Sequence, residues 1–146
     1  MFPRVLAELC AQYAAEYRLL SWIDVSKLHW VGLSSNPSAI DLLRANSDKI
    51  DWYCLSQNPA AIDLLRANSD KIAWNFLSRN PSAMDLLRAN PDKIDWYYLS
   101  HNPAAIDLLR ANPDKIEWRW LSFNESIFHL EPEPFIIDFL CRMKGY

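Results

Sequence analysis

A repeat of 22 residues constrains this chain more than any other feature of its sequence. The unit reads L-S-x-N-P-x-A-I-D-L-L-R-A-N-[S/P]-D-K-I-x-W-x-x and occurs four times between Leu33 and Trp120. Half a unit precedes it, and the stretch LSFNESIF from Leu121 begins a further unit and then departs from the pattern. A fixed period of this length is typical of repeat architectures, in which each unit packs against its neighbours.

Each unit predicts a short amphipathic helix that begins at its Asn-Pro dipeptide. Asn is a preferred N-cap residue, and Pro suits the first helical position because its φ is already helical. In the first unit this helix covers residues 37–45, where Ala39, Ile40, Leu42 and Leu43 fall on one face of a helical wheel. We expect that face to pack against the neighbouring units.

A second short helix is predicted after the Asn that ends the first one. In two units Pro follows this Asn, at Pro91 and Pro113, and an Asp stands in the first turn, where a carboxylate interacts favourably with the helix dipole. The apolar residues from Ile50 to Leu55 fall on more than one side of the wheel. The segment is therefore either apolar nearly all round, as a sandwiched helix is, or partly 3₁₀.

A leucine-rich repeat built on a strand also has units of about this length. Its inward strand position would hold Tyr97, whose copies are Asn75 and Arg119, and an inward position does not alternate between aromatic and charged side chains. Two Gly in the whole chain also fit poorly with frequent tight turns. Because a helix of eight or nine residues is marginal alone, we predict an all-α fold, a right-handed α-solenoid of short helical pairs.

The repeat also predicts the domain organisation, a single domain over residues 1–146. Its parts are an N-terminal cap with a half repeat (1–32), four complete repeats (33–120) and a degenerate repeat with a C-terminal cap (121–146). Residues 4–20 carry a helical apolar stripe, and Pro134 begins another. We expect both to form helical caps over the ends of the stack.

Composition disfavours several classes of function. The chain has 15 basic and 18 acidic residues, a formal net charge of −3 and no Lys/Arg cluster, so we expect no nucleic acid as partner. Its three Cys lack C-x-x-C spacing and a neighbouring His pair, so we expect neither disulfides nor a metal site, and no cofactor. No stretch matches a signal peptide or a membrane span, which predicts an intracellular protein in a reducing compartment.

The unit LSxNPxAIDLLRANxDKIxW, over residues 19–128, resembles the short tandem repeats of proteins encoded by large DNA viruses of algae and amoebae, which carry L-S-x-N-P-x-A-I-x-L-L-x-x-N and K-I-x-W segments. It is more loosely similar to the leucine-rich repeat variant, in which an α-helix alternates with a 3₁₀ helix, and it departs from that repeat at the Trp position. The resemblance implies an interaction or structural role and no reaction. It would place the protein in a host cytoplasm or a virion.

Five Trp share one phase of the repeat. This Trp column consists of Trp30, Trp52, Trp74, Trp96 and Trp118. One role for it is an aromatic ladder for a sugar polymer or a peptide; the role that we favour is packing that holds adjacent units together. The Asn columns are interpreted as helix caps, and the Asp and Arg three residues apart as solvated ion pairs.

The candidate binding face lies in columns that vary while the rest of the unit stays fixed. Column 57 reads Ser35, Gln57, Arg79, His101 and Phe123; column 53 reads Tyr53, Asn75, Tyr97 and Arg119; column 54 reads Cys54, Phe76, Tyr98 and Trp120. The first two mix residue types that a packed interior does not accept, so we expect them to face solvent. They either drift neutrally or bind a protein partner, and the candidate contacts are Gln57, Arg79, His101, Tyr53, Tyr97 and Arg119.

The function expected from these features is a non-enzymatic protein–protein interaction or scaffold module. No local Ser, His and Asp arrangement indicates a nucleophile. The alternative is a purely architectural, self-associating or virion component whose ends stack through cap residues such as Phe135 and Phe139. A glycan-binding groove or an enzyme comes third.

Overall fold

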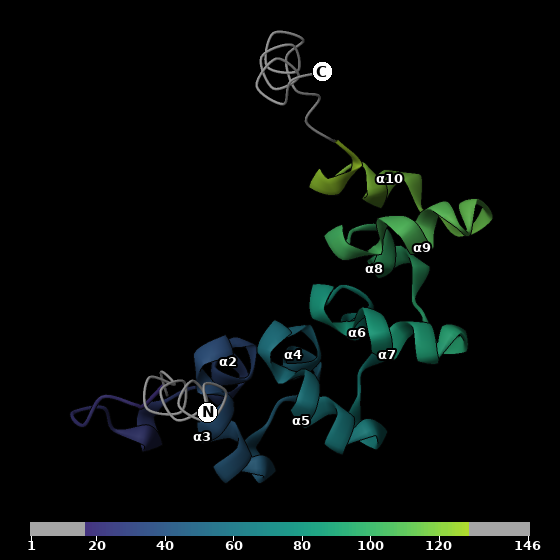
Figure 1. The fold of residues 1–146 in the computed structure, drawn as a ribbon. Helices are drawn as coiled ribbons and strands as arrows, with labels where there is room; N and C mark the ends of the chain where they lie inside the picture. The colour runs from purple at the N-terminus through teal and green to yellow at the C-terminus, as the bar shows by residue number, and fades with distance from the viewer. Residues whose placement is uncertain (1–16, 129–146) are drawn as a thin grey trace, which may run out of the picture.

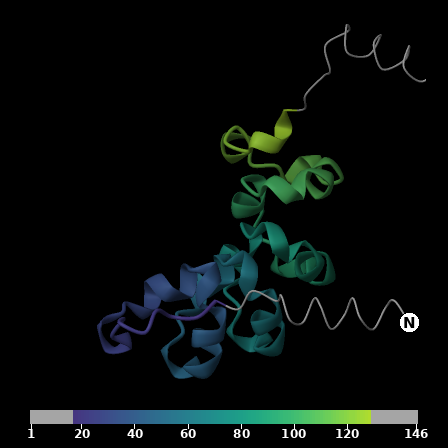
Figure 2. The same ribbon diagram turned by 60° about the vertical axis from the view of Figure 1, so that its left-hand side comes forward.

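The computed structural model describes residues 17–128, and every regular element in this part of the chain is helical. Each repeat contributes a 3₁₀ turn, an α-helix that begins at Trp, a second 3₁₀ turn and a second α-helix. The repeats stack side by side into a curved rod (Figures 1 and 2). The predicted all-α solenoid of tandem helical repeats is therefore confirmed.

Two rows of α-helices run along the stack. The inner row follows the inside of the bend in Figure 1 and consists of α2 (Trp30–Ser35), α4 (Trp52–Gln57), α6 (Trp74–Ser78), α8 (Trp96–Ser100) and α10 (Trp118–Leu121). The outer row consists of α3 (Ile40–Ala45), α5 (Ile62–Ala67), α7 (Met84–Ala89) and α9 (Ile106–Arg110). Successive inner-row helices contact one another directly, so this row has a continuous surface.

Turns of 3₁₀ helix, three residues each, connect the two rows. Those that lead into the outer row are η2 (Pro37–Ala39), η4 (Pro59–Ala61), η6 (Pro81–Ala83) and η8 (Pro103–Ala105), and η10 (Glu125–Ile127) occupies the equivalent place in the last unit. Those that precede the inner row are η1 (Val25–Lys27), η3 (Ser47–Lys49), η5 (Ser69–Lys71), η7 (Pro91–Lys93) and η9 (Pro113–Lys115). The helix predicted over 37–45 is thus a 3₁₀ turn continued by an α-helix.

The second helix predicted in each unit is partly 3₁₀, which was one of the two alternatives for it. It is also interrupted by two extended residues between the 3₁₀ turn and the α-helix. Ile50 (φ −68°, ψ 128°) and Asp51 (φ −83°, ψ 105°) are extended, and the Asp51 carboxylate caps α4 by accepting a 2.8 Å hydrogen bond from the amide of Cys54. Asn46 makes no side-chain cap to the turn that follows it. Its Nδ2 donates to the carbonyl of Leu42 at 2.9 Å, so this Asn column closes the outer helices.

Leu and Ala from both rows form the core. Its fully or almost fully buried side chains are Leu43, Leu55, Leu65, Leu77, Leu87, Leu99 and Leu109, with Ala39, Ala61, Ala83 and Ala105 beneath the 3₁₀ turns. These are unchanging columns of the unit, so each repeat buries the same side chains against its neighbours. A repeat on its own would leave one side of this set in water.

A ladder of buried Asn side chains crosses the repeats. The Asn ladder consists of Asn58, Asn80, Asn102 and Asn124. Asn80 is typical: its Oδ1 accepts from the amide of Ser82 at 3.0 Å, while its Nδ2 donates to the carbonyls of Ser56 and Asn58, both at 3.0 Å. The predicted capping role of this column is confirmed, and the same amide also bonds to the preceding repeat.

A column of buried Ser makes the reciprocal connection towards the following repeat. The Ser column consists of Ser34, Ser56, Ser78 and Ser100. The Oγ of Ser56 donates to the carbonyl of Trp52 at 2.7 Å and accepts from the amide of Ala73 at 3.1 Å. The amide of the extended residue before each Trp is satisfied in this way across the repeat boundary.

The predicted caps fall mostly outside the described residues. Of the N-terminal helix expected over 4–20, the described part holds residues 17–20, which are not helical, and the C-terminal cap from Pro134 lies wholly outside. Between residues 17 and 128, the helices are all too short to cross a membrane.

Replacement of Asn80 tests the ladder. Asn80→Ala removes a cap, takes the donor from the buried carbonyl of Ser56 and leaves the carbonyl of Asn58 with the amide of Ala61 alone, so we expect a loss of about 3 kcal/mol in the free energy of unfolding. Asn36 has the same cap to Ser38 but is exposed, and Asn36→Ala is the matched control, with an expected loss of about 1 kcal/mol. Urea unfolding followed by circular dichroism measures both, and equal losses would contradict the ladder.

Candidate functional site

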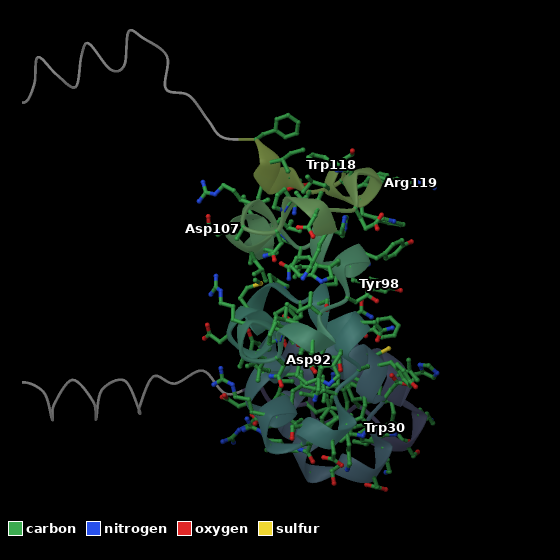
Figure 3. All side chains as sticks on the ribbon, turned by 90° about the vertical axis from the view of Figure 1, so that its right-hand side faces the viewer. Trp30, Asp92, Tyr98, Asp107, Trp118 and Arg119 are labelled. Atoms are coloured by element: carbon green, nitrogen blue, oxygen red, sulfur yellow. The ribbon has the colours of Figure 1, made fainter. Side chains whose placement is uncertain are left out.

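Columns 53, 54 and 57 meet along the inner row. The exposed members of the predicted face are Tyr53, Arg79, Tyr97 and Arg119, whereas Gln57 and His101 are half-buried. Figure 3 shows Tyr98 and Arg119 on one side of the stack, with Asp107 of the outer row on the opposite side. The variable residues therefore occupy one continuous side of the molecule.

A cleft of about 150 Å³ lies on this side, between the C-terminal end of α6 and the helices α8 and α10. Its walls are Arg79, Tyr97, Tyr98, His101 and Trp120, and we call it the aromatic cleft. It brings together three of the six predicted residues, Arg79 and His101 from column 57 and Tyr97 from column 53. Gln57 and Arg119 do not line it, and Tyr53 lies further along the stack against Phe76.

Aromatic rings connect across the repeats from one end of this side to the other. Tyr53 meets Phe76 edge to face at 5.7 Å between ring centroids, and Phe76 meets Tyr98 at 5.8 Å. Tyr97 then contacts both Tyr98, at 5.2 Å, and Trp120, at 4.5 Å. Aromatic pairs at these separations attract one another beyond the area that they bury.

Column 54 supplies Phe76, Tyr98 and Trp120 to this surface, and sequence reasoning did not select any of them. The signal was present, because the column is aromatic in three of its four copies. It was overlooked because a mostly aromatic column also suits a buried face, and only the stacking of α6, α8 and α10 shows that these three rings are half-buried and that Tyr98 and Trp120 line a cleft.

His101 and Arg79 form the polar wall of the aromatic cleft. Nη2 of Arg79 lies 3.3 Å from Nε2 of His101, and because a guanidinium can only donate, Nε2 is the acceptor in this contact. Nδ1 is buried and has no hydrogen-bond partner in the described part of the chain. The other side of the His101 ring faces Trp120 and Phe123, at 6.4 and 6.3 Å.

A second hollow adjoins the first at His101. It has a volume of about 210 Å³ and is lined by His101, Pro103, Phe123 and Glu125. The imidazole therefore separates two small depressions, one next to a guanidinium and one next to a carboxylate. A ligand that covers both would meet apolar surface flanked by opposite charges.

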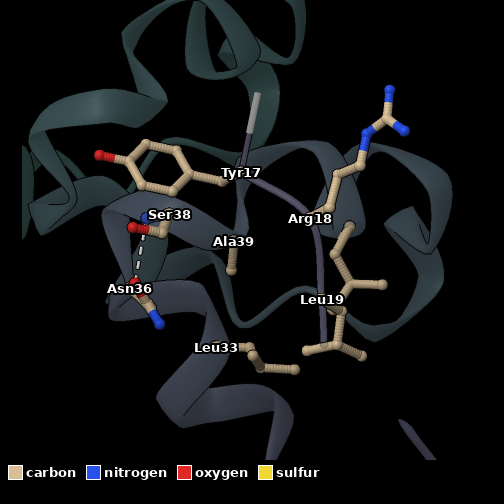
Figure 4. A pocket seen from close by; sticks show the side chains of 8 residues that line it. Tyr17, Arg18, Leu19, Leu33, Asn36, Ser38 and Ala39 are labelled. Atoms are coloured by element: carbon tan, nitrogen blue, oxygen red, sulfur yellow. Dashed lines mark hydrogen bonds between the residues drawn. The ribbon is translucent and has the colours of Figure 1, made fainter. Parts of the chain in front are cut away.

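Another hollow, of about 160 Å³, marks the N-terminal end of the stack (Figure 4). Tyr17 and Leu19 extend across it, and Leu33, Ala39 and Leu42 form its apolar floor. It holds none of the predicted site residues. Its position shows that residues 17–19 lie over the open end of the first repeat.

The described residues offer few groups for chemistry. Between residues 17 and 128, no three His, Cys, Asp or Glu side chains gather closely enough to hold a metal ion. The Asp and Arg of the outer row form exposed ion pairs, as predicted, for example Asp107 with Arg110 at 2.7 Å. Such exposed pairs contribute little stability.

Neither protein-family models, nor curated protein sequences, nor solved structures match this chain.

The Trp column packs between repeats. Trp30, Trp52, Trp74 and Trp96 are half-buried against the core, and a Lys of the following repeat lies over each ring, for example Lys93 at 4.6 Å from the centroid of Trp74. Trp118, in the last described inner helix, is 67% exposed. In the other four the cation occupies the ring face that a sugar would stack on.

Truncation of the Trp column tests this packing. Trp74→Ala removes apolar burial and a cation–π contact, and we expect the free energy of unfolding to fall by about 2–4 kcal/mol. Trp118→Ala, at the exposed position, is the matched control and should cost less than about 1 kcal/mol. If Trp74→Ala lowers the free energy of guanidinium unfolding by less than about 1 kcal/mol, the packing role of the Trp column is contradicted.

Proposed function

We propose that the protein is a non-enzymatic binding module that presents the aromatic cleft to a protein partner. The observation that carries the proposal is the connected surface of aromatic rings, which ends at a cleft walled by Arg79 and His101. Tyr, Trp and Arg are the residues that most often dominate the energetics of protein interfaces. Rigid repeats hold them in place, which lowers the entropy that binding costs.

The size of the cleft favours a side chain as its occupant. Pockets for cofactors and drug-sized ligands measure about 300–1,000 Å³, whereas this one measures about 150 Å³. A volume of this order suits one Pro or aromatic side chain of a partner, inserted between Tyr97, Tyr98 and Trp120. The remaining rings then provide area around that anchor.

The charge of the cleft favours an acidic neighbour beside that anchor. Arg79 is exposed and directs Nη2 to His101, so most of the N–H donors of its guanidinium remain open to a partner. A carboxylate of the partner can pair with those donors in a bidentate way. We therefore propose a short segment that carries an acidic residue close to a Pro or aromatic residue.

The cellular setting is also a proposal. We place the protein inside a cell, in a reducing compartment, because its three Cys show no disulfide pattern. A virion or an infected host cell is the more specific setting that we propose, and it rests on the resemblance of the repeat unit alone.

A displayed library of random peptides, selected against the full chain, tests this function. We expect enrichment of peptides with an acidic residue near a Pro or aromatic residue, and an affinity at least about tenfold lower for Tyr97→Ala and for Arg79→Ala. Arg110→Ala is the matched control, because Arg110 is exposed on the outer row and lies outside the cleft, and it should bind like the wild type. Enriched peptides that bind Tyr97→Ala equally well would contradict the proposal, as would a glycan as the only ligand found.

A further inference from the structure

The repeat boundaries in the stack use the same three kinds of contact, except that Nδ2 of Asn58 at the first boundary donates to the Ser34 carbonyl alone among the described residues. An Asn of the later repeat donates Nδ2 to a Ser carbonyl and an Asn carbonyl of the earlier one, as Asn102 does to Ser78 and Asn80. A backbone amide of the later repeat donates to a Ser Oγ of the earlier one. A Lys of the later repeat covers a Trp of the earlier one. These contacts have a direction, since donors come from the later repeat.

The N-terminal end of the stack carries the donor half of this set. Asn36 is exposed, its Oδ1 accepts from Ser38, and its Nδ2 makes no hydrogen bond in the described part of the chain. Lys27, in η1, has a side chain that is 82% exposed and pairs only loosely with Asp24, at 3.7 Å. His29 is the extended, exposed residue before Trp30. Its position in the repeat is the one that Asp51 occupies in the next repeat.

Asp24 holds this turn in shape. Its carboxylate accepts hydrogen bonds from the hydroxyl and the amide of Ser26, at 2.6 and 3.0 Å, which keep the pKa of Asp24 below its usual value. The turn that carries Lys27 therefore has a side-chain cap of its own, which the equivalent turns of the interior repeats lack, and it holds Lys27 at the same position of the repeat as Lys49, Lys71, Lys93 and Lys115.

The C-terminal end carries the acceptor half. Trp118 is exposed, with no Lys over its ring in the described part of the chain. Ser122 is exposed, and its Oγ donates to the carbonyl of Trp118 at 2.9 Å, as in the interior, without accepting from an amide between residues 17 and 128. Asn124, the last member of the Asn ladder, accepts at its carbonyl from the amide of Ile127 alone within residues 17–128, where the carbonyls of Asn58 and Asn80 also receive an Asn side chain.

We infer that two copies of this chain join head to tail, with α2 of the second copy placed as the next inner-row helix after α10 of the first. Nδ2 of Asn36 in the second copy then donates to the carbonyls of Ser122 and Asn124. The amide of His29 donates to Oγ of Ser122, and Lys27 covers Trp118. Every one of these contacts repeats a contact that the interior of the stack already makes.

This match favours a second copy as the occupant. An unrelated partner would have to place its donors at the same spacing as Asn36, His29 and Lys27 by chance. The charge is complementary, since a cation meets an exposed aromatic face. Both ends also expose large apolar side chains, Leu20 and Trp22 at one and Trp118 and Phe128 at the other. The contact joins two different surfaces, so a dimer formed through it keeps one free donor half and one free acceptor half to which further copies can add.

The test measures mass by light scattering coupled to size-exclusion chromatography over a hundredfold range of concentration, up to about 0.5 mM. We expect the mass of the full chain to rise above 17.0 kDa with concentration. Asn36→Asp keeps the acceptor for Ser38, but it replaces the donor with a carboxylate that faces two carbonyls, and Trp118→Ala removes the ring beneath Lys27. Each should weaken association by about tenfold or more.

Asn75→Asp is the matched control, because it adds the same charge in column 53, away from both ends, at a side chain without a hydrogen bond between residues 17 and 128. It should associate like the wild type, and circular dichroism should show all variants folded. An equimolar mixture of Asn36→Asp and Trp118→Ala should form dimers, since each retains the half that the other lacks. A steady mass of 17.0 kDa for the wild type, or no recovery in the mixture, would overturn the inference.

Discussion

The structure depends on one side chain that does two things, the buried Asn of each repeat. Its Oδ1 begins the 3₁₀ turn of its own repeat, and its Nδ2 bonds to two carbonyls of the repeat before it. Short helices expose more terminal backbone groups per residue than long ones, and a stack of helices this short would bury many of them. The Asn ladder and the Ser column satisfy those groups across the repeat boundary, which lets such short elements pack at all.

Because other columns make the contacts between repeats, part of each inner helix is not needed to hold the stack together. The Trp, Leu and Ser of an inner helix face the neighbouring repeats, so columns 53, 54 and 57 can change while the backbone stays in place. In the C-terminal half these columns hold aromatic rings, Arg79 and His101. The buried Nδ1 of His101, which has no partner among the described residues, costs stability, and this supports the proposal that the surface binds a partner.

The sequence predicts what lies within one repeat better than what lies between repeats. The Asn-Pro cap, the helical core stripe and the stacked architecture follow from local rules, and the 3₁₀ turns were one of two stated alternatives. The second bond of Asn80 could not be predicted, because it joins residues 22 and 24 positions apart, whose contact depends on the rise and bend of the stack. For the same reason the aromatic cleft, formed by three successive repeats, was predicted only in part: Arg79, Tyr97 and His101 of the predicted face line it, whereas Gln57, Tyr53 and Arg119 of that face lie outside it.

Hydrogen exchange of the Asn side-chain amides, followed by NMR on the full chain, tests the central role of the ladder most directly. The account predicts slow exchange at Nδ2 of Asn58, Asn80 and Asn102, because their protons are buried and bonded to the preceding repeat. Nδ2 of the exposed Asn36 should exchange at the rate of a free amide. Exchange at Asn80 as fast as at Asn36 would contradict the account, because the repeats would then be held together without the ladder.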